Sequence, residues 1–123
     1  MNTTLFGNLA IEGYDPVAYF QLDQAVKGAQ KFEYQWQGAT WRFSSEQNRS
    51  LFEANPGYYA PQYGGYCAYA VAQNKTAGID PEQFTIENDK LYLNYNAKIR
   101  KKWLENRAMF IEQADSNWPN VIE

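Results

Sequence analysis

The chain has 123 residues, a net charge of -3, one cysteine and no histidine. This length fits one domain, which we predict over residues 1–123. The acidic balance excludes a general nucleic-acid binder, because phosphate neutralisation needs an excess of Lys and Arg. Without histidine the chain lacks the side chain that most often acts as a base or metal ligand near neutral pH, and a single cysteine cannot form an internal disulfide.

No part of the sequence predicts membrane insertion or export. No apolar run approaches the roughly 20 residues that a spanning helix needs. The start at Met1-Asn2-Thr3-Thr4 does not resemble a secretion signal. We therefore expect a soluble chain with no membrane span, whereas the compartment and the oligomeric state stay open.

A short helix and a β-hairpin are predicted first. Asp15 can cap the free amides of a helix that begins at Pro16, which suits the first helical position. Large aromatic residues then alternate with polar ones in residues 31–37 and 39–44, which is the period of a half-buried strand. Gly38 separates the two segments, so we expect an antiparallel hairpin.

A second helix follows the hairpin and precedes an ambiguous segment. Ser45 is the expected cap of a helix that continues to Ala54, and Asn55-Pro56-Gly57 ends it. Within the next stretch, residues 66–72 fit either a short buried strand or a helix. Periodicity does not distinguish these alternatives.

The sequence of the C-terminal half predicts another hairpin and a helix. Residues 84–87 and 91–95 flank the turn Asn88-Asp89-Lys90. From Asn96 a broad apolar stripe continues to the boundary at Asn117-Trp118-Pro119. No repeat or linker divides the chain. The sequence therefore predicts an α+β fold in which two small antiparallel hairpins pack with short helices and a long C-terminal helix.

Several motifs in this order resemble the YHS-domain proteins, over about residues 9 to 121. The similarity is carried by Gly13–Phe20, Trp41–Ser45, Asn55-Pro56, Tyr63–Ala68 and Leu91–Tyr95. More narrowly, the chain resembles the stand-alone branch called YHS domain-containing (seleno)proteins, in which some members carry selenocysteine at the position of Cys67. Relatives in this branch are often exported, which implies a periplasmic or exported setting for them.

The resemblance implies the fold of the YHS and TRASH domains without their metal site. Smaller members of these families bind metal through cysteines. The corresponding positions are Ala18, Ser44 and Asn48 here, so the thiolates for a soft metal are absent. We expect no metal ligands at these positions, and no cofactor is clearly encoded.

Cys67 is the candidate catalytic residue. Two glycines and three tyrosines surround it in the segment Tyr63–Tyr69. Selenocysteine at this position in relatives implies a chemical use of the chalcogen, either in redox chemistry or as a soft ligand. The alternative is a small apolar group in the core, where free cysteines are commonly buried.

Aromatic and arginine side chains supply the candidate ligand-binding residues. Tyr63, Tyr66 and Tyr69 could line a cleft by stacking and phenolic hydrogen bonds, or could belong to the core. Arg100 and Arg107 lie seven residues apart near the apolar side of the predicted helix. They are a candidate anion clamp, with ion pairs to surface acids as the alternative.

Three functions are consistent with these residues. The first is a binding or accessory module, and not an enzyme, whose Tyr-rich segment around Cys67 meets a small ligand, a soft metal or a redox partner. The second is a thiol-dependent oxidoreductase in which Cys67 is the thiolate and an external thiol resolves it. The third is a structural or protein-interaction domain without chemistry.

Overall fold

The computed structural model describes residues 1–123 and confirms the α+β class. Six α-helices and two two-stranded antiparallel sheets form the fold, together with three 3₁₀ turns. The elements are α1 (Pro16–Leu22), β1 (Ala29–Trp36), β2 (Ala39–Phe43), α2 (Glu46–Ala54), α3 (Pro56–Tyr59), α4 (Ala68–Ala72), β3 (Phe84–Glu87), β4 (Lys90–Leu93), α5 (Ala97–Glu105) and α6 (Arg107–Asn117).

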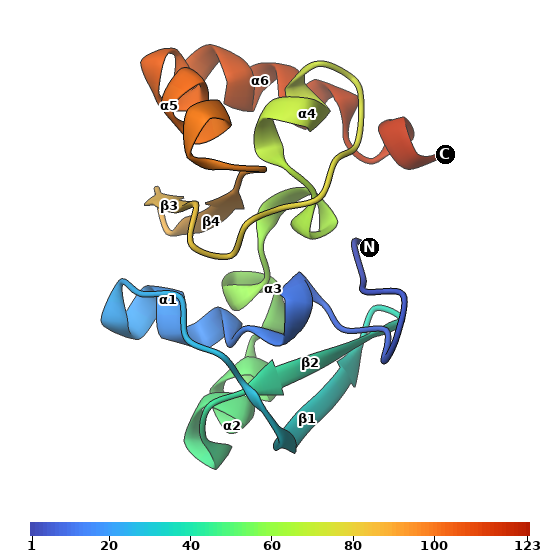
Figure 1. Cartoon of the computed structure of the whole chain (residues 1–123), viewed down its shortest axis with the longest axis vertical. Helices are drawn as coiled ribbons and strands as arrows, with labels where there is room; N and C mark the ends of the chain where they lie inside the picture. Colours follow the sequence, from blue (N-terminus) through green and yellow to red (C-terminus); the bar gives the residue numbers. More distant parts are fainter.

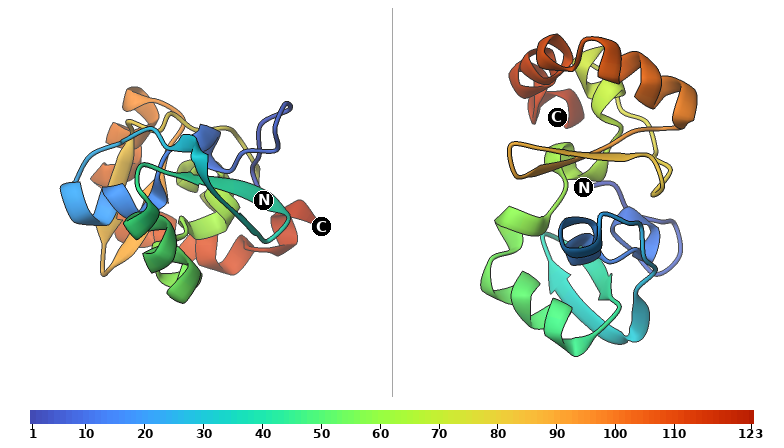
Figure 2. Two further views of the ribbon diagram at one scale, coloured as in Figure 1. Left: turned by 90° about the horizontal axis from the view of Figure 1, so that it is seen from below. Right: turned by 90° about the vertical axis from the view of Figure 1, so that its left-hand side faces the viewer.

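The elements are arranged in two groups along the long axis of the molecule (Figure 1). The group from α1 to α3 lies in the lower half of the view, and the helices α4, α5 and α6 lie in the upper half. The hairpin of β3 and β4 lies between them, as the side view also shows (Figure 2). Both chain ends lie on the same side of the molecule, the N-terminus near the junction of the two halves and the C-terminus in the upper half (Figure 1).

The caps predicted in the N-terminal half are present. The Asp15 carboxylate accepts hydrogen bonds from the first amides of α1, and Ser45 accepts from the amide of Asn48 at the start of α2. The first hairpin pairs Tyr34 with Trp41. Its two-residue turn holds Gly38 at φ 73°, a conformation that glycine adopts without strain.

Aromatic rings fill the first core. Trp41 and Phe43 of β2 are fully buried, and their ring centroids lie 4.9 and 5.2 Å from that of Phe52 in α2. Rings in tilted or edge-to-face contact bury large apolar areas at low entropy cost. This packing places α2 against the first hairpin and explains the aromatic alternation in the sequence.

Strand β4 contributes to two cores at once. Leu91 and Leu93 belong to the first core, whereas Tyr92, which points the opposite way, belongs to a second core with Trp103 of α5. Successive side chains of a strand point to opposite faces, so both faces of this short strand are covered. The second hairpin is therefore the layer that joins the two halves.

The C-terminal helical segment divides at Asn106. This residue has φ -150° and ψ 48°, outside the helical region, and it separates α5 from α6. The apolar stripe continues through the break. Trp103 of α5 and Ala114 of α6 are both fully buried in the second core, so the division lets the two helices share that core. In the same half of the molecule, residues 68–72 form α4, which resolves the alternatives of strand and helix.

Candidate functional site

Cys67 lies at the N-terminal cap of α4 and is buried, with only 1% of its surface exposed. Its amide donates to the carbonyl of Ala77 at 3.0 Å, and its thiol donates to Asn94 Oδ1 at 3.5 Å. Burial raises the pKa of the Cys67 thiol, although the nearby amides of Ala70, Tyr95 and Tyr69 act in the opposite direction. A buried, neutral thiol is a poor nucleophile.

Asn94 is the polar partner of Cys67 and is itself fully buried. Its Oδ1 also accepts from the amide of Tyr69 at 3.1 Å, which fixes the orientation of the side-chain amide. The Nδ2 group has no hydrogen-bond partner. Cys67, Asn94 and the Tyr69 amide form what we call the Cys67 cluster, which joins the start of α4 to the end of β4.

The positions of the metal-binding cysteines implied by the resemblance lie together around one carboxylate. Asp15 is fully buried and accepts from Ser44 Oγ at 2.7 Å and from Asn48 Nδ2 at 2.8 Å. It also accepts from the amides of Ala18 at 3.3 Å and Ser44 at 2.8 Å. Asp15, Ser44 and Asn48 form the Asp15 cluster, in which hydrogen bonds tie α1, β2 and α2 together.

Tyr63 places the Tyr-rich segment at the largest cavity. The residue is 4% exposed, and its hydroxyl donates to Asp115 Oδ1 of α6 at 2.8 Å. Burial, followed by this hydrogen bond, raises the pKa of the Tyr63 phenol. The next residue, Gly64, has φ 60°, and a Cβ there would lie 2.9 Å from the Trp118 ring. Glycine is therefore required where Trp118 packs on this turn.

The cavity is a cleft of about 640 Å³ between the two halves. Five segments that are separate in the sequence line it: Met1, the turn end of the first hairpin, the stretch from α3 to Gly64, the start of β4, and the end of α6 with the residues that follow it. Its side chains include Trp36, Gln37, Tyr63, Lys90, Asp115 and Trp118. Its volume lies within the roughly 300–1,000 Å³ that is typical of small-molecule sites. We call this cavity the interhalf cleft.

The other two candidate tyrosines lie outside the lining of this cleft. The Tyr66 hydroxyl donates to the carbonyl of Met1 at 3.4 Å, and the Tyr66 ring centroid lies 6.1 Å from that of Trp118. Tyr69 packs against Phe110 at 5.2 Å between centroids. Both are half-buried and pack on the second core.

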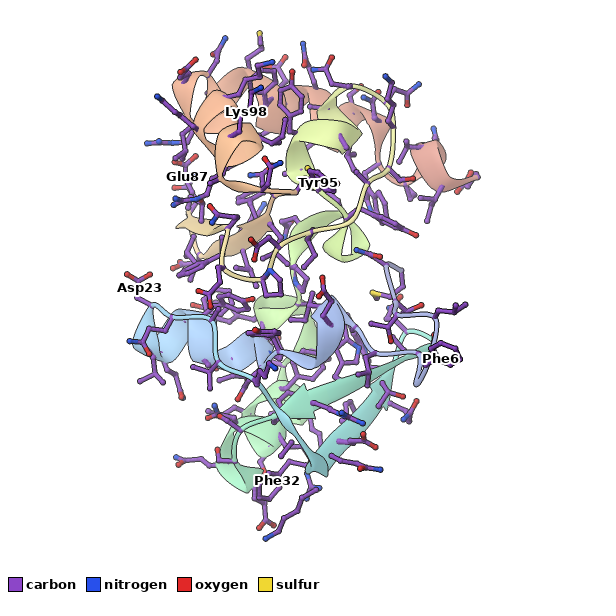
Figure 3. All side chains as sticks on the ribbon, viewed as in Figure 1. Phe6, Asp23, Phe32, Glu87, Tyr95 and Lys98 are labelled. Atoms are coloured by element: carbon purple, nitrogen blue, oxygen red, sulfur yellow. The ribbon has the colours of Figure 1, made fainter.

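The two candidate arginines belong to different helices and have separate partners. Arg100 of α5 donates from Nε to Thr85 Oγ1 at 3.1 Å and lines a separate pocket of about 290 Å³. Arg107 of α6 forms an ion pair with Glu87, which lies at the end of β3, below α5 in Figure 3. The structure therefore does not bring the arginines together with the tyrosines.

Two further features bear on ligands and membranes. No group of three or more His, Cys, Asp or Glu side chains is placed to hold a metal ion. None of the helices combines the length and apolar character needed to cross a membrane.

Comparisons of the chain with models of protein families, with curated proteins and with solved structures found no match. The relationship to YHS-domain proteins therefore stays a prediction from the sequence motifs.

Four residues that line the interhalf cleft were not among the candidate site residues predicted from the sequence. Trp36 was expected only in the hairpin core, Lys90 only in a turn, and Asp115 had no expected role. Trp118 was expected only as a helix boundary. The one usable signal was the pair Gly64-Gly65 beside Tyr63, which indicates a close backbone approach but does not identify the partner.

Proposed function

We propose that the protein is a binding module, and not an enzyme, that holds a small molecule in the interhalf cleft. The observation that carries this proposal is the hydrogen bond between Tyr63 and Asp115, which both line a cleft of about 640 Å³. Ligand sites combine aromatic walls with a few fixed polar groups, and they occur preferentially between packed units. The proposal keeps the Tyr-rich segment as the binding element and places the ligand at its Tyr63 end.

Thiol chemistry is less well supported than binding. An oxidoreductase needs a reachable thiolate, whereas Cys67 is 1% exposed and burial raises its pKa. Cys67 is also absent from the lining of the cleft. We propose that the thiol packs in the second half and supports the turn that carries Tyr63.

We further propose kinship with the YHS-domain proteins on the motifs alone. The arrangement of Ala18, Ser44 and Asn48 around Asp15 supports this proposal, since residues that correspond to metal ligands should lie close in space. Hydrogen bonds to one carboxylate would then replace the metal as the link between α1, β2 and α2.

The binding proposal is tested by filling the cleft. Gly57 lines the cleft, and a Cβ there would meet no atom within 4 Å, so Gly57→Trp adds an indole without a clash at the backbone. Gly78→Trp is the matched control, because Gly78 has equal room but lies at a different pocket. Each protein is dialysed against a metabolite extract, and the retained small molecules are identified by mass spectrometry.

We expect the wild-type protein and Gly78→Trp to retain the same compounds, and Gly57→Trp to lose them. Retention that is equal in all three proteins would place binding elsewhere. The absence of any retained compound in the wild type would favour the structural or protein-interaction alternative.

A further inference from the structure

The side chains that line the interhalf cleft include one acidic and one basic group, and neither has an ionic partner on the protein. Lys90 and Asp115 are the only charged side chains among its lining residues. Neither takes part in any of the four ion pairs of the structure, with each other or with a third group. Asp115 accepts only the Tyr63 hydroxyl, through Oδ1. Both charges are therefore available to a ligand.

Aromatic rings lie near the carboxylate. The Tyr63 hydroxyl contacts Asp115, and the Tyr63 ring centroid lies 6.2 Å from that of Trp118, in an edge-to-face arrangement. The face of an aromatic ring is electronegative and attracts organic cations, and a nearby carboxylate adds to this attraction. This end of the cleft is suited to an ammonium group.

Lys90, which belongs to a different segment, favours an anionic group of the ligand. It is the first residue of β4 and lines the same cleft as Asp115 of α6. An ammonium ion on a flexible stem is a strong partner for carboxylates. A ligand with one charge would satisfy only one of these groups, whereas a ligand with both charges satisfies both.

We propose that the interhalf cleft binds a small zwitterion of the amine-and-carboxylate type. Its ammonium group lies against Asp115, Tyr63 and Trp118, and its carboxylate lies against Lys90. This inference rests on the proposed binding function and specifies the ligand class. It assigns a specificity role to Lys90 and Asp115.

The test uses trimethylglycine as the zwitterion and its two charged parts, tetramethylammonium and acetate, as separate probes. Binding is measured by calorimetry and by the fluorescence of tryptophan, since Trp36 and Trp118 line the cleft. We expect trimethylglycine to bind at least about tenfold more tightly than either part, because two charge contacts are made at once.

Two charge-removing variants identify the contacts. Asp115→Asn keeps an acceptor for the Tyr63 hydroxyl. It should weaken the binding of trimethylglycine about tenfold, which is the effect of losing one charged contact. Lys90→Gln should also weaken the binding of trimethylglycine, about fivefold, because water screens the ion pair of this exposed lysine. Asp115→Asn should also weaken tetramethylammonium, and Lys90→Gln should not. Glu112→Gln is the matched control on α6, since Glu112 lines a different pocket.

The zwitterion proposal would be overturned if trimethylglycine bound no more tightly than tetramethylammonium or acetate. It would also be overturned if the affinity for trimethylglycine were unchanged in both variants. That result is distinct from failure of the binding function. If the cleft-filling variant still loses compounds from the extract while trimethylglycine does not bind, the cleft binds another class of ligand and only this inference fails.

Discussion

The Asp15 cluster and the Cys67 cluster occupy corresponding places in the two halves. In each half a left-handed turn precedes a tyrosine whose amide donates back to the turn: Tyr14 to Ile11 at 3.1 Å, and Tyr66 to Tyr63 at 3.0 Å. The following residue, Asp15 or Cys67, lies at the N-cap position of a short helix, α1 or α4. A two-residue hairpin turn and a helix capped by a side chain come next in both halves. The sequence showed no repeat, yet this local arrangement occurs twice.

The two halves differ in the residue at the N-cap position of the short helix, which is Asp15 in α1 and Cys67 in α4. The amide of Asp15 donates to Val26 at 2.8 Å, and that of Cys67 donates to Ala77 at 3.0 Å, so the backbone is held in the same way. The two side chains, however, are held differently. Five donors meet the Asp15 carboxylate, whereas Cys67 makes one weak hydrogen bond, to Asn94. The same backbone arrangement can thus be completed by a buried charge or by a small apolar group.

The difference has an energetic meaning. A buried carboxylate is stable only while its donors remain, and each donor is stable only while the carboxylate remains. The second half instead depends on packing around Trp103 and Tyr92, whose ring centroids lie 5.3 Å apart. The free energy of unfolding should therefore fall much more when Asp15 is replaced than when Cys67 is replaced.

Asp15→Ala should have the largest effect. It leaves the buried donors of Ser44 and Asn48 without an acceptor, and we expect a loss of about 4 kcal/mol in the free energy of unfolding. Urea denaturation measures this loss. Glu46→Ala removes an exposed carboxylate and should change stability by less than about 0.5 kcal/mol. A comparably small effect of Asp15→Ala would refute the importance of the Asp15 cluster.

Alkylation tests the burial of Cys67. In the native protein we expect iodoacetamide to react about a hundredfold more slowly than in the urea-unfolded chain, because the thiol must first be exposed by local opening. Mass spectrometry over time gives both rates. Native labelling as fast as that of the unfolded chain would revive the oxidoreductase hypothesis.

Cys67→Ala should destabilise the protein far less than Asp15→Ala does. It removes one small buried group and a weak hydrogen bond, which we expect to cost about 1.5 kcal/mol. Ligand retention by the interhalf cleft should persist, since Cys67 does not line it. A loss equal to that of Asp15→Ala would show that the two clusters are energetically equivalent.

Tyr63→Phe should have the smallest effect at neutral pH, about 1 kcal/mol for the hydrogen bond to Asp115. The folded-state pKa of Tyr63 is raised above its ordinary value of 10.0, so the neutral phenol is the form that folding favours. This stabilisation is complete below pH 10 and is lost as the pH rises through the folded-state pKa.

Between pH 9 and 11, wild-type stability should therefore fall more steeply than that of Tyr63→Phe, as measured by urea denaturation at each pH. Tyr19 and Tyr92 also have raised pKa values, so some alkaline destabilisation should persist in the variant. The exposed Tyr58 is the control, and Tyr58→Phe should follow the wild-type slope. Parallel slopes for wild type and Tyr63→Phe would contradict this prediction.

Local signals explain how much of the fold the sequence predicts. The caps Asp15 and Ser45 and both hairpins depend on residues close in the chain, so pattern and spacing were sufficient. The division at Asn106 was not predicted, because the apolar stripe passes through it without interruption. It depends on how two helices share one core, which is a tertiary effect.

The candidate site was only partly predictable for a related reason. Tyr63 lies at the interhalf cleft, but Tyr66, Tyr69, Arg100 and Arg107 do not line it. The cleft forms where five separate segments meet, and no local sequence pattern predicts their approach. Whether a single cysteine in an aromatic segment is buried or exposed likewise depends on packing from outside that segment.

The double role of β4 determines how the chain can be divided. Leu91 and Leu93 complete the interior of the N-terminal half although they lie in the C-terminal half of the chain. A fragment that ends after α3 would expose that interior to water, and the complementary fragment would expose the outer face of its hairpin. The protein should consequently melt in a single cooperative transition, and cleavage between the halves should yield two fragments that regain structure only when mixed.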